Sequence, residues 1–325
     1  MRVCSDDDVA AVLDLADLLP VVADAFERQG RGAVERPDRP HFPVGTGLAR
    51  EGSEATDEPL GTGLAMPAYL HSDETYATKL VAVHPDNPPD RPTIHAQILL
   101  TDAGTGEPAA LLAGERITNA RTGCIGGLAA ARLAESPIRL GVIGAGAQAR
   151  WQVRAIDAAT DLTDVCIYSP SDSRERCASD LRERGIDARA VDSPRAAVEG
   201  ATVVVTATTA TSPTFPADAL AAGMLVVAVG AYTEETQELP PDVVERAARL
   251  YADVPEEAVE TGDLLAANHG DPVPFSNVVA GDEPAVGDEE VVLVKSVGTA
   301  VLDAAAGGYV YDAARSQGLG TVVDL

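Results

Sequence analysis

The sequence has no hydrophobic run long enough to cross a membrane. Hydrophobic residues make up 46% of the chain, but charged residues, at 23%, interrupt every apolar stretch before the ~20 residues that a spanning helix needs. The first residues, MRVCSDDDVAAV, are acidic after Arg2 and lack the pattern of a signal peptide. This composition predicts a globular, cytoplasmic protein without a membrane partner, and 325 residues are enough for two domains.

Cysteine and histidine are scarce, and their spacing does not suit a metal. No two of the four cysteines form a C-x-x-C pair, and a cytosolic protein keeps such cysteines as free thiols. The five histidines form neither H-x-x-x-H nor H-E-x-x-H. We therefore expect no metal site. The cysteines are Cys4, Cys124, Cys166 and Cys177.

Basic residues are few. The chain has 24 Lys and Arg against 51 Asp and Glu, which gives a formal net charge of −27 at pH 7. A nucleic-acid backbone needs a basic face, so we expect no nucleic-acid partner. Such an acidic surplus resembles proteins of halophilic organisms, whose ions screen the self-repulsion. An acidic mesophilic protein is the alternative, and the choice concerns the solvent rather than the function.

The most informative stretch is residues 138–149, IRLGVIGAGAQA. Its apolar start followed by G-x-G-x-x-A predicts a buried strand, a tight turn at Gly144 and a helix. Gly146 has no Cβ, so a pyrophosphate can approach the backbone, and the small Ala149 lets the helix lie close to the strand. The helix N-terminus attracts the anion. The stretch predicts a dinucleotide-binding turn, with an ordinary strand-to-helix turn as the alternative.

The chain from 138 to about 299 alternates apolar strands with helices. Because parallel strands need helical crossovers, this alternation predicts an α/β fold with a doubly wound parallel sheet of the Rossmann type. The expected strands are 140–143, 165–168, 188–191, 203–206, 225–229 and 250–252.

The chain before residue 138 predicts a separate α+β domain. Two helices are expected over residues 5–30, the second starting at Pro20 because proline interrupts the apolar pattern. Short strands and turns over 33–70 are followed by longer antiparallel strands. The last segment, helical after Gly298, is expected to pack on this domain. The longer strands are expected around 76–83, 93–101 and 109–113, with a helix over 118–135 capped by Thr118 or Asn119.

Three sites in this part carry basic side chains that suit an anion. Arg36 and Arg39 form a basic island in an acidic chain, aimed at a carboxylate or lying in a solvated loop. Lys79 is expected to face away from Leu80 on a strand. Arg121 falls in the first turn of the helix expected over 118–135, where a cation is poorly placed unless an anion meets it.

The second strand of the expected parallel sheet bears on the choice of cofactor. It ends Ile167-Tyr168-Ser169-Pro170, with no acid before Asp172. An acid there would bind the ribose 2′-hydroxyl of NAD, whereas hydroxyls and an arginine such as Arg174 suit a 2′-phosphate. NADP(H) is therefore favoured over NAD(H). Arg174 and Arg176 on a solvated helix face are the alternative.

Five stretches together resemble the ornithine cyclodeaminase/μ-crystallin family along nearly the whole chain. They are KLVAVHPDNPPDRPTIHAQILLTDAGTGEPAALLAGERITNARTG from Lys79, GAGAQA, VVVTATT, VVAVGAYTEETQEL and VKSVG. The resemblance implies a homodimer, a nicotinamide cofactor and small α-amino or α-imino acid substrates. It also implies a discontinuous substrate-binding and dimerisation domain, 1–118 with 299–325, around a Rossmann domain, 119–298.

The resemblance also assigns roles to single residues. Arg39, with Arg36 as a competitor, and Lys79 match positions that hold the substrate carboxylate, and Arg121 matches one near substrate and cofactor. Val297 is expected on the substrate side, and Lys79 and Arg121 are the expected catalytic residues. With the residues argued above, the expected cofactor contacts are Thr93, Thr122, Gly144, Gly146, Ala147, Gln148, Ser169, Arg174, Thr208, Val229, Gly230, Ala231 and Ser296.

One position departs from the family pattern. Tyr232 stands where the cyclodeaminases and the archaeal alanine dehydrogenase have an aspartate, and tyrosine is not a carboxylate base at neutral pH. Asp73, Glu234 and Glu235 are candidates to replace this aspartate, but the sequence gives no reason to choose any of them. The G-A-Y-T form looks more like the family's ketimine reductases.

We therefore expect NADPH-dependent reduction of an α-imino acid, such as the cyclic ketimine pyrroline-2-carboxylate, to the L-amino acid. Arg39 and Arg121 would hold the carboxylate, and Lys79 or a water that it positions would deliver the proton. A strand lysine paired with a glutamate is the alternative for Lys79. An alanine dehydrogenase, an ornithine cyclodeaminase and an inactive NADP-binding protein stay open as alternatives.

Overall fold

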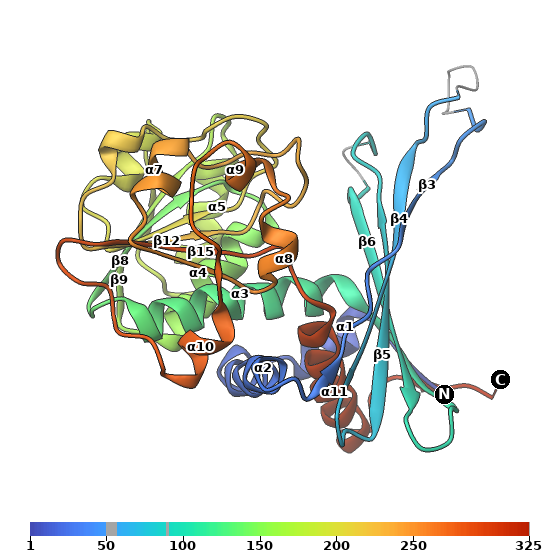
Figure 1. The fold of residues 1–325 in the computed structure, drawn as a ribbon. Helices are drawn as coiled ribbons and strands as arrows, with labels where there is room; N and C mark the ends of the chain where they lie inside the picture. The colour runs from blue at the N-terminus through green and yellow to red at the C-terminus, as the bar shows by residue number, and fades with distance from the viewer. Residues whose placement is uncertain (50–56, 89–90, 325) are drawn as a thin grey trace. The chain divides into compact units, whose positions relative to one another are not determined.

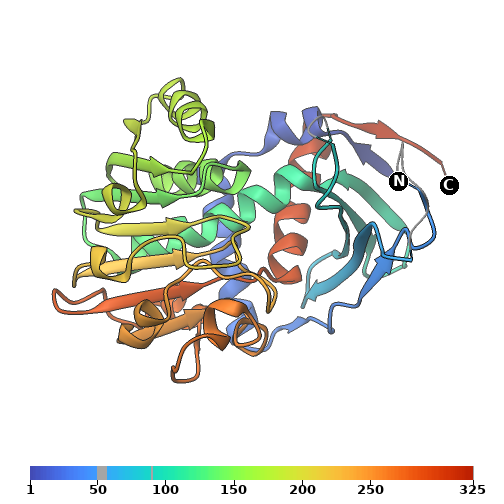
Figure 2. The same cartoon turned by 90° about the horizontal axis from the view of Figure 1, so that it is seen from above.

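The computed structural model describes residues 1–49, 57–88 and 91–324. Their contacts divide the chain into two compact units, both drawn in Figures 1 and 2. Unit 1 comprises Met1–Asp14, Arg31–Thr118 and Ala300–Leu325, and unit 2 comprises Leu15–Gly30 and Asn119–Thr299. Residues 15–30 thus group with unit 2 by their contacts, whereas the sequence placed them in the first domain. The functional labels of the two domains stay predictions.

Unit 1 is built on a largely antiparallel sheet. In the described part of the chain its eight strands run in the order β16-β1-β7-β6-β5-β4-β2, with β3 paired to β4. Only the pair β1 and β7 is parallel. The strands are β1 (Arg2–Cys4), β2 (Val34–Glu35), β3 (His41–Val44), β4 (Gly61–Leu70), β5 (Thr75–Val83), β6 (Ile94–Asp102), β7 (Pro108–Ala113) and β16 (Thr321–Val322).

Two helices complete unit 1. α1 (Asp6–Val12) begins at a capping box in which the Ser5 hydroxyl accepts from the Asp8 N–H and the Asp8 carboxylate accepts from the Ser5 N–H. α11 (Ala300–Ser316) packs on β4, β5 and β6 and buries Val301, Leu302 and Val310. The predicted C-terminal helix and its packing on the first domain are confirmed.

The region 33–70 differs from its prediction. Instead of short strands alone, it contains the ten-residue strand β4, which includes Pro67. β4 pairs with the long strand β5 and with the short strands β3 and β2, and these partners stabilise a strand whose own glycines and proline argue against it. The strands predicted at 76–83, 93–101 and 109–113 are confirmed within two residues at each end.

Unit 2 is built on a parallel sheet. Among the described residues its eight strands run in the order β10-β9-β8-β11-β12-β15-β13-β14, which Figure 2 shows side by side. This confirms the doubly wound fold. The strands are β8 (Ile138–Ile143), β9 (Leu162–Tyr168), β10 (Ala188–Ala190), β11 (Val203–Thr206), β12 (Met224–Ala228), β13 (Arg249–Ala252), β14 (Val273–Pro274) and β15 (Val291–Lys295).

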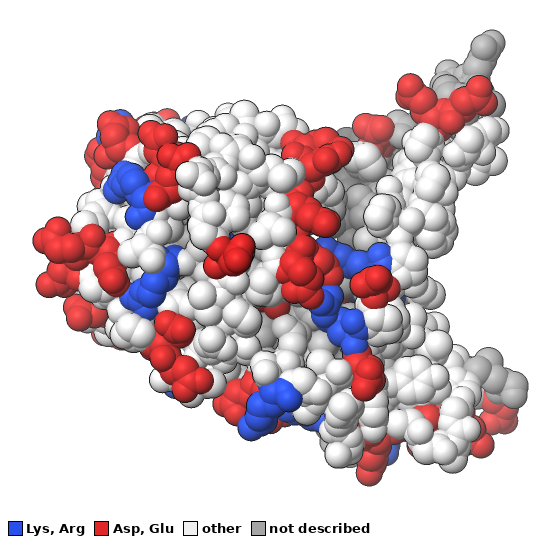
Figure 3. All heavy atoms as spheres, viewed as in Figure 1, with Lys and Arg blue, Asp and Glu red and all other residues white. Residues whose placement is uncertain are grey.

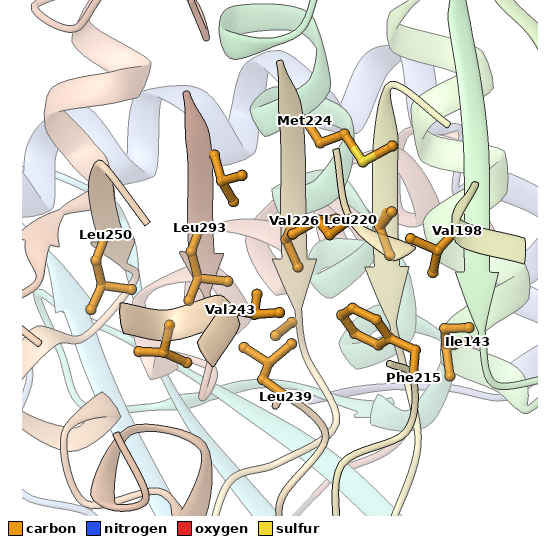
Figure 4. Packing of buried hydrophobic residues seen from close by; sticks show 14 of the residues in the cluster. Ile143, Val198, Phe215, Leu220, Met224, Val226, Leu239, Val243, Leu250 and Leu293 are labelled. Atoms are coloured by element: carbon orange, nitrogen blue, oxygen red, sulfur yellow. The ribbon is translucent and has the colours of Figure 1, made fainter. Parts of the chain in front are cut away.

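Helices cover both faces of this sheet. In Figure 1, α7 (Pro241–Arg246) and α9 (Gly262–Leu265) lie above it, and α4 (Ala147–Ala159) lies below. Figure 4 shows the apolar core under α7, where Val243, Phe215 and Leu239 meet Val226 and Leu293 of the strands. The other helices of unit 2 are α2 (Leu15–Gly30), α5 (Ser173–Arg182), α6 (Pro194–Val198), α8 (Pro255–Ala258), α10 (Phe275–Ala280) and the 3₁₀ helix η1 (Ala217–Ala219), while α3 (Gly114–Leu133) contains the boundary between the units.

Two helix starts were predicted wrongly. α2 begins at Leu15 and continues through Pro20, because its buried stripe, which includes Leu18, Leu19 and Val22, packs on both sides of the exposed proline. α3 begins at Gly114, directly after β7, and not at residue 118. Arg121 therefore lies in the second turn of α3, and the helix-dipole reason for its role does not hold.

The sequence also missed the central strand β15, whose five residues are all buried. The run VVLVK is apolar except for its last residue, so it has no hydrophobic periodicity that would distinguish a strand from a helix. The glycines of α3 let this helix pack closely on α4. A Cβ at Gly123 would lie 2.6 Å from the Trp151 carbonyl oxygen of α4, and one at Gly127 would lie 2.7 Å from that of Ala155.

All four cysteines are buried free thiols. Burial raises the pKa of the Cys124 thiol to about 12, and it also raises the pKa values of Cys4, Cys166 and Cys177. Because the thiolate is the reactive form, we expect a thiol reagent at pH 8 to label none of them in the native protein. Unfolding should release four thiols per chain, and rapid labelling of the native protein would contradict the burial.

Acidic side chains dominate the surface. On the face drawn in Figure 3, patches of Asp and Glu are spread over the surface and Lys and Arg are sparse. Several of the acids pair with arginine, such as Asp6 with Arg116 at 2.6 Å and Asp218 with Arg195 at 2.7 Å. The excess of acid in the sequence is therefore largely solvent-facing, where salt screens it.

Candidate active site

The turn from β8 to α4 has the geometry of an anion site. Gly144 has φ +115°, and a Cβ there would lie 2.4 Å from the Ala207 carbonyl oxygen, so the chain itself requires this glycine. A Cβ at Gly146 would meet nothing within 4 Å. Gly146 is also the N-cap of α4 and provides no side-chain cap, which leaves the first N–H groups to a ligand. A pyrophosphate fits this turn.

Two side chains of α4 hold the turn. The Arg150 guanidinium donates to the carbonyl oxygens of Ala145, at 2.6 Å, and Gly146, at 3.1 Å, and its Nε donates to Asp180 of α5. Gln148 Nε2 donates to Asn119 Oδ1 of α3 at 2.7 Å. Arg150 thus fixes the orientation of the Ala145 and Gly146 carbonyl groups. The sequence analysis did not identify this residue.

Hydroxyl groups collect after the end of β9. Ser173 Oγ lies 2.9 Å from Ser169 Oγ and 2.8 Å from Ser171 Oγ. Arg174 Nη1 donates to the Ser169 carbonyl oxygen at 3.0 Å, and Nη2 lies 3.5 Å from the fully exposed Asp192. Arg176 is exposed on the same helix. Three hydroxyls and one guanidinium are therefore in place at the strand end that faces the cofactor ribose in this fold.

Buried Glu238 connects the ends of β11 and β12. Its Oε1 accepts from the Thr208 N–H at 2.6 Å, and its Oε2 accepts from the Thr206 hydroxyl at 2.9 Å. The N–H groups of Gly230 and Ala231 also donate to Oε2, at 2.7 and 3.2 Å. Because all four partners are donors, the site suits an ionised carboxylate.

A buried ion pair between Lys295 and Asp263 supports Glu238. Lys295 Nζ, at the end of β15, donates to Asp263 Oδ2 at 2.8 Å and to the Ala231 carbonyl oxygen at 2.6 Å. Asp263 Oδ1 accepts from the N–H groups of Glu238 and Leu239. Burial raises the pKa of Glu238 and the Asp263 charge raises it further, whereas the Lys295 ammonium and the backbone donors lower it.

A third buried carboxylate, Asp253, follows β13 and holds the turn after β15. Its oxygens accept from the Ser296 hydroxyl at 2.7 Å and from the N–H groups of Val297 and Gly298 at 2.9 and 2.8 Å. Gly298 has φ +83°, and a Cβ there would lie 3.2 Å from both terminal nitrogens of Arg121. The structure thus brings Arg121, Ser296 and Val297 together within unit 2.

In unit 1, Lys79 lies on the buried face of β5. Its Nζ is 2.5 Å from Asp303 Oδ2 of α11, and both side chains are at most 2% exposed. Leu80 points the other way and is 47% exposed, which confirms the predicted alternation. Lys79 and Lys295 are the two lysines of the chain, and each is buried against an aspartate.

The remaining predicted residues are Arg36, Arg39, Thr93 and Thr122. Arg36 and Arg39 are half-buried in the connection from β2 to β3 of unit 1. Thr93 is exposed just before β6 in the same unit, unlike the other predicted cofactor contacts, which belong to unit 2. Thr122 is buried on α3, and its carbonyl oxygen accepts from Gln152 of α4 at 2.9 Å.

Within residues 1–49, 57–88 and 91–324, no group of three or more His, Cys, Asp or Glu side chains could hold a metal ion. In the same ranges no helix has the length and apolar character that crossing a bilayer requires.

A model of the ornithine cyclodeaminase/mu-crystallin family matches residues 2–318. This chain belongs to that family. The Delta(1)-pyrroline-2-carboxylate reductase of Bacillus cereus is 33% identical over 275 residues, which cover 80% of this chain and 83% of that protein.

Two solved structures of family members are also similar. The structure of the Thermococcus litoralis Delta(1)-pyrroline-2-carboxylate reductase in complex with NADH and L-proline superposes with a TM-score of 0.91 at 29% identity, over 99% of this chain and all of that one. An archaeal alanine dehydrogenase dimer with bound NAD gives a TM-score of 0.88 at 26% identity, over 100% and 99% of the two chains.

Tyr232, at the position where the resemblance led us to expect an aspartate in part of the family, follows the turn that ends β12. Its N–H donates to Thr236 Oγ1 at 3.0 Å, and its side chain is 43% exposed. The acids that follow it, Glu234 and Glu235, are exposed. The turn therefore carries a phenol in the place of a carboxylate.

Sequence reasoning missed one half-buried arginine and several buried charged residues of this family member. Lys295 was detectable, because it ends the apolar run VVLVK in a chain with two lysines. The acids carried no such signal, because a chain with 51 acidic residues does not mark the few that are buried. The missed residues are Arg150, Glu238, Asp253, Asp263, Lys295 and Asp303.

Proposed function

We propose that this protein is an NAD(P)H-dependent reductase of small α-imino acids, most simply a cyclic ketimine such as pyrroline-2-carboxylate. One observation carries the proposal: the turn at Gly146 is open to a pyrophosphate, in a chain that aligns over 99% of its length with a reductase whose structure holds NADH and L-proline. A reduced nicotinamide supplies the hydride that the imine carbon gains.

The chain's own residues supply binding and the proton. The guanidinium groups of Arg121 and of Arg39 or Arg36 suit the substrate carboxylate, because their planar forks match its two oxygens. Lys79, or a water that it positions, donates the proton to the imine nitrogen. Asp303 stabilises the ammonium form and fixes Nζ, so the proton donor is charged and held in place before the reaction.

The test is to follow NADPH and NADH oxidation with pyrroline-2-carboxylate, piperideine-2-carboxylate, and pyruvate with ammonia, in high KCl because of the net charge of −27. Oxidation with a cyclic imine in the absence of ammonia supports the reductase. An absolute need for ammonia would instead support an alanine dehydrogenase, the activity named for the similar archaeal dimer.

Two further outcomes would refute the proposal. Formation of proline from ornithine without net oxidation would indicate a cyclodeaminase, which Tyr232 disfavours because it places no carboxylate at the β12 turn. Tight NADPH binding with no turnover of any substrate would indicate a binding protein. The cytoplasmic location expected from the sequence stays a prediction.

We propose NADP(H) as the preferred cofactor, supported by the hydroxyl cluster and Arg174 after β9. Loss of a charge-assisted hydrogen bond costs about 1.5–3 kcal/mol. Arg174→Ala is therefore expected to raise KM for NADPH by roughly 10- to 150-fold and to leave KM for NADH nearly unchanged. The exposed Arg176, on the same helix, provides the matched control Arg176→Ala. Equal losses for both cofactors would contradict a 2′-phosphate site.

We also propose a homodimer that pairs through the sheet of unit 1. Phe42, Tyr76 and Leu80 share the face of this sheet that points away from α11, and they are 53%, 38% and 47% exposed. Such a contiguous apolar face indicates a partner, and a second copy fits because the similar archaeal enzyme is a dimer.

Leu80→Asp is expected to convert the dimer to a monomer in analytical ultracentrifugation, because it buries a charge at the centre of this face. Leu265→Asp on unit 2, where leucine is 60% exposed, is the control and should stay dimeric. A dimeric Leu80→Asp protein, or a monomeric unmodified chain, would contradict the proposal.

A further inference from the structure

Three charged side chains of unit 2 form a buried cluster behind the turns that end β11 and β12. Glu238, Asp263 and Lys295 are each 0% exposed. Removing a charge from water costs several kcal/mol per ion, so the burial of three charged groups together indicates that they have a specific structural role. They make up one connected network, in which Lys295 pairs with Asp263, Asp263 binds the Glu238 N–H, and Glu238 and Lys295 bind main-chain groups of the two turns.

The network controls where the main-chain groups of these turns point. Glu238 binds the N–H groups of Thr208, Gly230 and Ala231, and Lys295 binds the Ala231 carbonyl oxygen. The backbone polar groups of both turns are thus held toward the interior. A Cβ at Gly230 would lie 2.1 Å from the Thr208 carbonyl oxygen, so the two turns touch, and a change in one displaces the other.

The use of lysine at this place is itself informative. The chain contains 22 arginines and two lysines, and exposed positions use arginine. A compact ammonium fits between Asp263 Oδ2 and the Ala231 carbonyl oxygen, at 2.8 and 2.6 Å, where a planar guanidinium with five donors would not. A lysine at this position therefore indicates that the site requires the small ammonium group, which makes both contacts.

Resting on the proposed function, we propose that Glu238, Asp263 and Lys295 act as positioning residues for the nicotinamide end of the cofactor. In a doubly wound sheet the ligand lies outside the carboxyl ends of the strands, and the expected contacts Thr208, Gly230 and Ala231 are residues that this network holds. The pyrophosphate turn at Gly144 and Gly146 has separate supports in Arg150 and Gln148. The network therefore binds main-chain groups of the nicotinamide end directly, whereas it reaches the pyrophosphate turn only indirectly, where Gly144 packs against Ala207 and Thr208.

Separate supports make the proposal testable with two nucleotides. The matched probe is ADP-ribose with a 2′-phosphate on its adenosine, called ADP-ribose below, which has the same adenosine end and pyrophosphate as NADPH and no nicotinamide. Glu238→Gln presents an amide nitrogen to donors and should displace both turns. We expect it to weaken NADPH binding about tenfold or more, measured by nicotinamide fluorescence, and to lower kcat, while ADP-ribose binds within about twofold of the unmodified protein. The exposed Glu235→Gln, three residues away, is the matched control.

A milder variant covers the case in which Glu238→Gln does not fold. Thr206→Val removes one donor to Glu238 without changing the side-chain shape, and it should shift NADPH binding in the same direction by a smaller factor. Equal weakening of NADPH and ADP-ribose, or binding of both as in the unmodified protein, would overturn the positioning role. Failure of the unmodified protein to bind either nucleotide would instead refute the proposed function.

Discussion

Replacing Lys79 by methionine is expected to lower kcat/KM for the imine by about 10²- to 10⁴-fold, the range that general acid catalysis contributes. Methionine fills the same buried space on β5 but can neither donate a proton nor position a water. The measurement is the initial rate of NADPH oxidation at saturating cofactor, over a range of imine concentrations.

The buried partner of Lys79 decides how this result is interpreted. Removing one member of a buried ion pair destabilises a protein by about 3–5 kcal/mol, because the other charge is left uncompensated. Lys79→Met with Asp303→Asn removes both charges, and we expect this double variant to keep its thermal transition and stay inactive. Thr78→Val, on the opposite face of β5, is the control for strand perturbation. A folded double variant with normal turnover would contradict the proposed role of Lys79 in proton donation.

Replacing Gly146 by valine is expected to weaken NADPH binding by about 100-fold or more and to leave the fold intact. A Cβ at this position has nothing within 4 Å beyond its chain neighbours, and φ −83° suits any residue. The valine methyl groups would instead occupy the space over the first N–H groups of α4, where the pyrophosphate is proposed to bind.

Gly270 provides a matched control for this substitution. It also lies in unit 2, has nothing within 4 Å of its Cβ position and is exposed. Gly270→Val should keep both the thermal transition and the NADPH affinity. If Gly146→Val bound NADPH as tightly as Gly270→Val, the turn between β8 and α4 would not be the phosphate site.

The two lysines show how composition and structure combine in this protein. An acidic surface that uses arginine for its few cations leaves lysine at two buried positions, one in each unit. Each ammonium contacts one aspartate and lies in a cluster that we propose to serve the reaction. Amine-directed labelling would therefore reach the N-terminus before either lysine side chain.

The sequence by itself determined the elements whose pattern is local. The strand, turn and helix of residues 138–149 were predictable because a tight turn and an open N-terminus impose glycines at fixed spacing. The Ser5 and Ser193 caps were readable for the same reason, since a cap depends on a few consecutive residues. Alternation on β5 predicted that Lys79 faces away from Leu80, as it does.

Only the tertiary structure decided which distant residues meet. Asp303 neutralises Lys79 because α11 returns to the sheet of unit 1, and Asp253 binds the turn at Ser296 because β13 and β15 are neighbours. No local pattern marks one buried acid among 51. Packing also overrode propensity at Pro20, which lies inside α2, since burial of a helix face outweighs the loss of one backbone hydrogen bond.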